Sequence, residues 1–246
     1  MEKIAQKEID WLMNLGRKKY GKNRYAFIGS DLRKNILQIC LGLAGLFGLI
    51  ILPFFLLIRT SVYLKLTHGF AGWAALGGGM IAAILLLITY ILLLFRNIQN
   101  KKLLLKYSLA GVSTMVVGFC MFSLFYLSGV NAKSSEVREL YRSMHPIMRV
   151  AISTITLADG GLVVTEIGRV PADYERMGLP VNPASLHYIQ HTGYVHAVDL
   201  RTNDRSYLRN ILLRYSLQMM GFRTLYHKGT AHHLHVELAV RRNQRR

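Results

Sequence analysis

The sequence predicts a protein of two parts: an all-α membrane region of three transmembrane helices, then a small α+β domain with a mostly antiparallel sheet. The first observation is a conflict in composition. The 246 residues include 31 Lys+Arg against 13 Asp+Glu, a formal charge of +18, yet 52% are hydrophobic and the mean hydropathy is +0.26. A soluble globule this basic should average below zero, so the apolar residues must be segregated. The second observation is that long apolar runs give way to short mixed elements after residue 130.

These observations divide the chain into a basic segment (1–35), a three-span region (36–130) and a C-terminal domain (131–246). The two cysteines, Cys40 and Cys120, both lie inside long apolar runs. A disulfide scaffold and a Cys-ligated zinc finger are therefore excluded.

Three runs without charged residues, 36–58, 69–95 and 107–130, each exceed the ~20 residues that a membrane-spanning helix needs. The first run follows 35 polar and basic residues and lacks a small-residue cleavage site, so we expect it to be retained as a span rather than removed as a signal peptide. The glycines at 77–79 would let a neighbouring helix approach the second span closely.

The basic residues flanking these runs predict the orientation. Nine lie in residues 1–35 and four in the second connection, against two in the first connection. We therefore expect the N-terminus to be cytoplasmic and the C-terminal domain to lie outside. Ile4, Trp11, Leu12 and Leu15 recur at near-helical spacing among lysines, which fits either an amphipathic helix on anionic lipid or a solvated basic arm.

In the C-terminal domain the pattern predicts an α+β fold. The helix at 206–220 carries Leu208, Leu212, Tyr215 and Met219 at amphipathic spacing and stops at Gly221. The other expected elements are helices at 134–141 and 146–156, strands at 162–165, 193–200, 222–226 and 233–240, and a loop at 168–186.

Nucleic acid is not an expected partner. The basic tail at 241–246 is interpreted as a solvated or lipid-facing charge run, because the predicted orientation places it outside the cell. The sequence also contains no Gly-rich phosphate loop and no Ser-centred nucleophile elbow.

Histidines are concentrated in the C-terminal domain. Seven of the nine fall between His187 and His235. Strand alternation places His233, His235 and Glu237 on one face and His232 on the other. A histidine from the turn before the preceding strand, together with Asp199 and His235, could therefore close on one metal ion, since zinc takes three or four N, O or S ligands.

The order and spacing of several segments resemble the LAS metallopeptidases, the superfamily of lysostaphin-type enzymes, D-Ala-D-Ala peptidases and the hedgehog signalling domain. The resemblance covers about residues 146–240 and none of the membrane region. It rests on Val163-Val164-Thr165-Glu166-Ile167-Gly168-Arg169, Ser185-Leu186-His187, His196-Ala197-Val198-Asp199-Leu200-Arg201, Gly221-Phe222 and His233-Leu234-His235-Val236-Glu237.

The resemblance implies a zinc peptidase that acts on peptidoglycan stem peptides. Asp199 and His235 would be zinc ligands, and His233 would lie beside the metal. Arg169 would hold a substrate carboxylate or the oxyanion.

The sequence departs from the family pattern at two places. Family members usually have six residues between the ligand histidine and the aspartate, whereas eleven separate His187 from Asp199 and seven separate His191 from it. The Ser-x-His context favours His187 and the spacing favours His191, so both are candidate ligands.

Many members also carry an acidic base three residues before the last ligand. Here that position is His232, so either His232 or His233 serves as the base or the site is catalytically weak.

We therefore expect a peptidoglycan peptidase of the D-Ala-D-Ala carboxypeptidase or endopeptidase type, with Zn²⁺ as cofactor. It would be a multi-pass protein of the bacterial cytoplasmic membrane, with the lipid bilayer and peptidoglycan peptides as partners. One alternative is an inactive zinc-binding module for wall binding or signalling. Another is a membrane assembly or transport subunit, although the spans hold none of the ionisable residues that mark transport paths.

Overall fold

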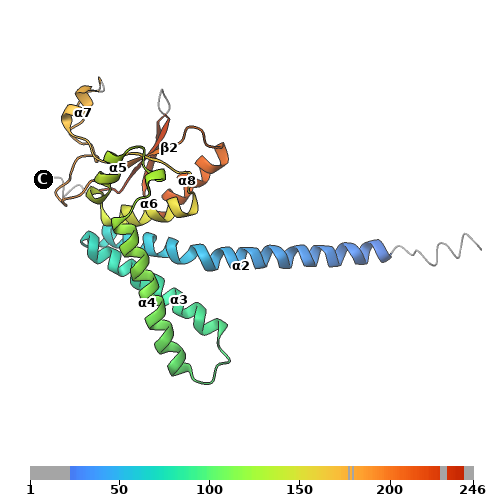
Figure 1. Ribbon diagram of the computed structural model, residues 1–246. Helices are drawn as coiled ribbons and strands as arrows, with labels where there is room; N and C mark the ends of the chain where they lie inside the picture. The colour runs from blue at the N-terminus through green and yellow to red at the C-terminus, as the bar shows by residue number, and fades with distance from the viewer. Residues whose placement is uncertain (1–22, 177, 179, 228–231, 241–246) are drawn as a thin grey trace, which may run out of the picture. The chain divides into compact units, whose positions relative to one another are not determined.

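The computed structural model describes residues 23–176, 178, 180–227 and 232–240 (Figure 1). The expected amphipathic segment around Trp11 and the basic tail at 241–246 lie outside the described residues. The chain forms two compact units, Met1–Ile50 and Ile51–Arg246. The second unit includes most of the predicted membrane region together with the C-terminal domain.

Three helices are long and apolar enough to cross a membrane. They are α2 (Asn23–His68), α3 (Gly72–Leu94) and α4 (Lys101–Phe125), and all three overlap the predicted spans. The third helix begins six residues before Tyr107, because Lys101, Lys102 and Lys106 form its first turns.

Close backbone approach joins α2 to α3. A Cβ added at Gly79 would lie 2.1 Å from the Ser61 Oγ and 2.2 Å from the Leu57 carbonyl oxygen, and one at Gly78 would lie 2.3 Å from Leu64. Only glycine fits at such distances, as expected for small residues at membrane helix contacts.

The C-terminal domain is α+β, as predicted, and its sheet is antiparallel throughout. Its elements are η1 (Gly129–Asn131), α5 (Ser135–Glu139), η2 (Leu140–Ser143), α6 (Pro146–Ala158), β1 (Val164–Glu166), α7 (Pro171–Arg176), β2 (Ala197–Arg201), α8 (Tyr207–Met220), β3 (Arg223–His227) and β4 (His233–Glu237). The short helix α7 lies within the segment that was expected to be a loop.

The four strands lie in the order β1-β2-β4-β3. Alternation gives the sheet two different faces. Val198 and Leu200 of β2 and Leu234 and Val236 of β4 are buried and belong to the hydrophobic core. The opposite face carries Asp199 and the odd-numbered residues of β4. The sheet thus has an apolar face that packs into the core and a polar face that carries Asp199, His233 and His235.

Helix α6 lies between the sheet and the helices α3 and α4 (Figure 1). Ten of its thirteen residues are buried, including Arg149, which is 4% exposed. The Arg149 guanidinium donates to the carbonyl oxygen of Leu124 at 2.7 Å and lies over the rings of Trp73 and Tyr194. Because a buried charge is costly without partners, these contacts fix where α6 meets the ends of α3 and α4.

A buried histidine caps α6. The His145 Nδ1 accepts a hydrogen bond from the Ile147 backbone N–H at 3.3 Å, and its ring lies 4.7 Å from that of His196. Burial, followed by the charges of His196, Lys65 and Arg149, lowers the pKa of His145 to about 2. Burial likewise lowers the pKa of His196 to about 4. Both imidazoles are therefore neutral at pH 7.

Helix α8 begins and ends where the sequence predicts, but it buries a different face. Ser206 caps its start and Gly221, at φ +103°, ends it. The predicted stripe from Leu208 to Met219 is exposed, whereas Leu213, Leu217 and Met220 are buried. The helix therefore has two apolar stripes, and the one formed by Leu213, Leu217 and Met220 packs into the core.

Substitution of Gly221 by alanine should destabilise the protein. The added Cβ would meet the Arg59 guanidinium at 2.5 Å and Val62 at 2.8 Å, at a backbone φ that side chains rarely adopt. We expect a loss of about 1–3 kcal/mol, measured as a lower midpoint of thermal unfolding in detergent. In the control, Gly160→Ala, the new Cβ has nothing within 4 Å and should leave the midpoint nearly unchanged. Equal midpoints for the two variants would contradict this packing.

The buried His145 predicts a loss of stability in acid. Its folded-state pKa lies below the unfolded value of 6.5, so the unfolded chain binds more protons, and the stabilisation present above pH 6.5 is lost as the pH falls. We expect about 1–2 kcal/mol of loss from this group between pH 7 and pH 5. His145→Asn keeps a capping acceptor and removes the titration, so its unfolding midpoint should fall less over that range. His191→Asn, at an exposed position, serves as the control and should retain the wild-type pH dependence.

Candidate metal centre

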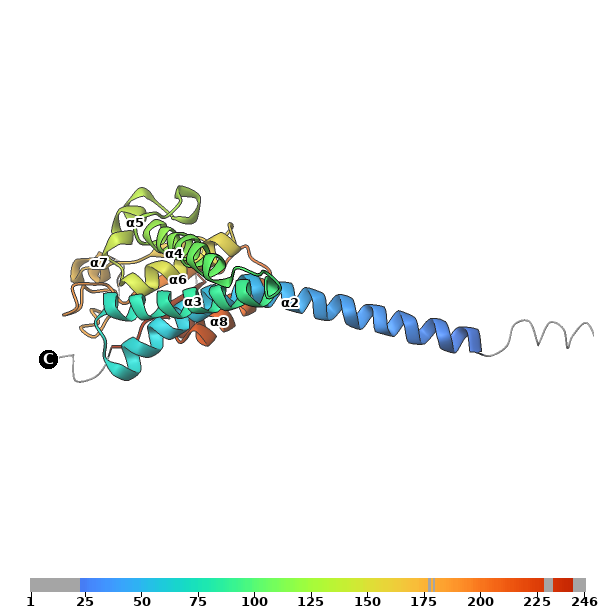
Figure 2. The ribbon, with the colours of Figure 1, turned by 90° about the horizontal axis from the view of Figure 1, so that it is seen from below.

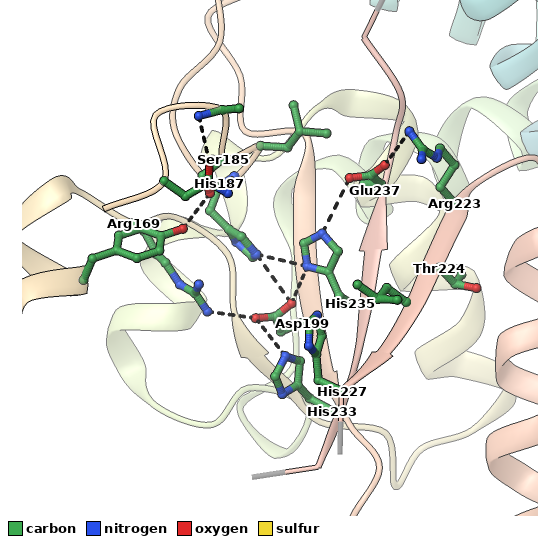
Figure 3. Close-up of a pocket in the computed structure, with 15 residues that line it drawn as sticks. Arg169, Ser185, His187, Asp199, Arg223, Thr224, His227, His233, His235 and Glu237 are labelled. Carbon is green, nitrogen blue, oxygen red and sulfur yellow. Dashed lines mark hydrogen bonds and ion pairs between the residues drawn. The ribbon is translucent and has the colours of Figure 1, made fainter. Parts of the chain in front are cut away.

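Three potential ligand atoms from distant parts of the chain converge on the open face of the sheet (Figure 3). His187, Asp199 and His235 each offer an atom within 4.8 Å of the others. The Asp199 Oδ1 lies 2.8 Å from the His235 Nδ1 and 3.4 Å from the His187 Nε2, and the two histidine nitrogens are 3.3 Å apart. This cluster could hold a metal ion.

Sheet register places two of these residues. Antiparallel pairing of β2 with β4 sets Asp199 directly opposite His235, where side chains on one face lie about 5 Å apart at Cβ. The β3–β4 hairpin adds His227 opposite His233 and Leu225 opposite His235. The histidines of β4 therefore reach the aspartate of β2 because of strand pairing alone.

Long-range backbone contacts place the third residue. The loop that carries His187 bonds to the segment after β1, where the Arg169 backbone N–H donates to the His187 carbonyl oxygen at 3.1 Å. The His187 Nδ1 lies 2.7 Å from the Ile167 carbonyl oxygen. Because a carbonyl oxygen can only accept, Nδ1 carries a proton, and Nε2 is the ring atom that faces Asp199.

Glu237 is an acceptor for His235 in the same way that the Ile167 carbonyl oxygen is an acceptor for His187. Its Oε2 lies 3.7 Å from the His235 Nε2. An acceptor on that side favours a proton on Nε2, so Nδ1, the atom that faces Asp199, is the one that could bind a metal. Both histidines thus have an outer partner of the kind that orients metal ligands. The donor set of two imidazoles and one carboxylate fits zinc.

The electrostatics keep Asp199 ionised. Asp199 is 2% exposed, and burial would raise its pKa, but hydrogen bonds from His187 and His235 hold the pKa of this carboxyl far below its usual range. Burial would lower the pKa of His235, yet the bonds and charges of Asp199 and Glu237 raise it to about 9. Without a metal, the His235 ring is therefore protonated at pH 7 and pairs with the ionised Asp199, and a bound metal ion would take the place of the proton on Nδ1.

Arg169 is held by acidic side chains. Its guanidinium donates through Nε and Nη2 to Glu166 and through Nη2 to the Asp199 Oδ2 at 3.1 Å. The sequence suggested that Arg169 would bind a substrate group. In the structure it lines the cavity while its hydrogen bonds fix the Asp199 carboxylate.

The structure does not bring two of the predicted candidates to this centre. His191 is exposed and lies outside both the ligand cluster and the cavity lining. His232 precedes β4 and belongs to the opposite face, with its ring 6.4 Å from that of Tyr226. Strand alternation sends His232 away from the cluster while it brings His233 to within 3.8 Å of the Asp199 Oδ2.

Sequence reasoning gave no role to His227, Glu166 or Glu237. The ring of His227 stacks on that of His233 at 4.8 Å. Burial, followed by the charges of His233 and His235, lowers the pKa of His227. The β3–β4 register could have revealed His227, and alternation along β4 already placed Glu237 on the correct face.

The cluster opens into a cavity of about 590 Å³. Its wall combines the histidines with Arg223, Leu225 and Tyr174, so it offers charged, apolar and aromatic contacts. A cavity of this size can take a short peptide or another small ligand.

Comparisons with known protein families, with curated proteins and with solved structures found no match to this chain.

Proposed function

We propose that this protein is a membrane-anchored zinc peptidase that hydrolyses stem or cross-link peptides of peptidoglycan. The observation that carries the proposal is the convergence of His187, Asp199 and His235, with each histidine held by an outer acceptor, in the wall of a cavity. The substrate class rests on the sequence resemblance to LAS metallopeptidases.

The membrane region supports the proposed location. Three helices are apolar and long enough to span a bilayer, and the basic residues around them favour a cytoplasmic N-terminus. In this arrangement the C-terminal domain lies outside the bacterial cytoplasmic membrane, where peptidoglycan is found.

Each residue has a distinct part in the proposed mechanism. His187, Asp199 and His235 would hold zinc, which when bound polarises a scissile carbonyl and lowers the pKa of water. Arg169 keeps the Asp199 carboxylate in place through its hydrogen bond to Oδ2. Glu237 orients His235, and its own position is held by Arg223 at 3.2 Å.

His233 is the proposed proton acceptor. It lies on the cavity wall beside Asp199 and stacks on His227. An imidazole beside the proposed metal is a suitable group to accept a proton from water and to pass it on. His233 would take a proton from the attacking water and return it to the leaving amine.

Zinc content tests the ligand assignment. We expect the full chain, purified in detergent, to carry about one zinc per molecule by elemental analysis, and His187→Ala or His235→Ala to lose most of it. His191→Ala should keep the metal, because that side chain is exposed and outside the cluster. Loss of zinc from the His191 variant, with retention in the His187 variant, would reverse the assignment.

Activity on muropeptides tests the reaction. His233→Ala should lower kcat by about 10²–10⁴-fold while zinc content stays at the wild-type level. The adjacent His232→Ala is the matched control and should keep both zinc and activity, because His232 belongs to the other face.

Two outcomes would count against this mechanism. Equal losses in the His232 and His233 variants would remove His233 from the reaction. Full zinc occupancy with no product released by the wild-type protein would indicate a non-catalytic zinc-binding module instead.

A further inference from the structure

Helix α8 has a second apolar stripe that the described residues leave exposed. Leu208, Leu212, Tyr215 and Met219 are 64%, 57%, 60% and 65% exposed, and they recur at spacings that align them on one side of a helix. The stripe lies about 140° around the helix from the one that packs into the core. Elsewhere in the described part of the C-terminal domain, exposed large apolar side chains such as Leu157 and Ile189 are scattered singly. A continuous apolar stripe indicates a binding surface.

The end of α8 lies beside α2 where the charge-free apolar run stops. A Cβ on Gly221 would lie 2.5 Å from the Arg59 guanidinium and 2.8 Å from Val62. Arg59 is the first charged residue after the apolar run 36–58. If α2 spans the membrane, this contact places α8 at the depth where hydrocarbon meets the polar headgroups. Figure 2, which looks from the side on which α3 and α4 leave the domain, shows α8 alongside α2.

The composition of the stripe suits this depth. Leucine and methionine favour acyl chains, whereas tyrosine prefers the boundary between lipid and water. Tyr207, at the start of α8, is 82% exposed. The exposed Arg209 lies at one edge of the stripe, where its guanidinium pairs with Asp159 at 2.8 Å, and a positive side chain at this level attracts anionic headgroups.

We propose that α8 is an interfacial helix whose outer stripe is embedded in the membrane leaflet nearest the C-terminal domain. The partner is the lipid surface, because α8 ends beside Arg59, where the apolar run of α2 stops, and its stripe has the composition of a lipid–water boundary. The domain is then held to the bilayer by α8 as well as by α6. The metal cluster lies on the opposite face of the sheet and therefore faces away from the lipid.

Site-directed spin labelling of the full chain tests this. Cys40 and Cys120 are replaced by alanine, and a nitroxide is attached to Leu212→Cys or, as the matched control, to Arg214→Cys. Both positions are exposed, but they point about 160° apart around the helix. The protein is reconstituted in vesicles of phosphatidylethanolamine and phosphatidylglycerol. Accessibility is measured to oxygen, which concentrates in lipid, and to a water-soluble nickel chelate.

We expect the label at 212 to be several-fold more accessible to oxygen than to nickel, and the label at 214 to show the reverse. Equal nickel accessibility at the two positions would overturn the proposal. Dipolar broadening at 212 that disappears on dilution with unlabelled protein would also overturn it, because the stripe would then bind a second copy. The zinc content of each labelled protein, compared with wild type, verifies that the fold is retained.

Discussion

The buried carboxylate of Asp199 is the group on which the functional face of the domain depends. A charge that is 2% exposed would oppose folding unless partners replaced the lost water. Those partners come from three separate places: Arg169 after β1, His187 in the loop before β2, and His235 on β4. One negative charge therefore orders segments that are far apart in the sequence, and the same negative charge makes the cluster suitable for a cation.

The other face of the sheet forms part of the hydrophobic core. Its apolar residues pack on the layer of α6 and α8, and α6 in turn packs on α3 and α4. The order of layers is thus the cluster, the sheet, the helices and the spans. The cluster and the contacts with the apolar helices α3 and α4 therefore lie on opposite sides of one sheet.

The sequence predicted most elements because local patterns determine them. Charge-free runs marked the spans, Ser206 and Gly221 marked the ends of α8, and alternation placed His233 and His235 on one face. The choice between His187 and His191 could not be made, because it depends on hydrogen bonds from the loop to Ile167 and Arg169, more than fifteen residues away.

The buried side of α8 shows a second limit. Its residues form two apolar stripes, and the sequence pattern does not say which one the core takes. The answer depends on the neighbours, in particular on the contact of Gly221 with Arg59 and Val62. The sequence could not predict the partners of Arg169 for a similar reason. Glu166 is only three residues away, but Asp199 reaches Arg169 only because β1 pairs with β2.

The position of α6 has a consequence for the independence of the C-terminal domain. One side of this helix covers the sheet and the other packs against α3 and α4, so almost no side of it reaches water. A chain cut free at residue 131 would present that second apolar side, together with the unpaired Arg149 guanidinium, to solvent. The apolar helices α3 and α4 therefore complete the core of the domain, and detaching them would leave an aggregation-prone fragment.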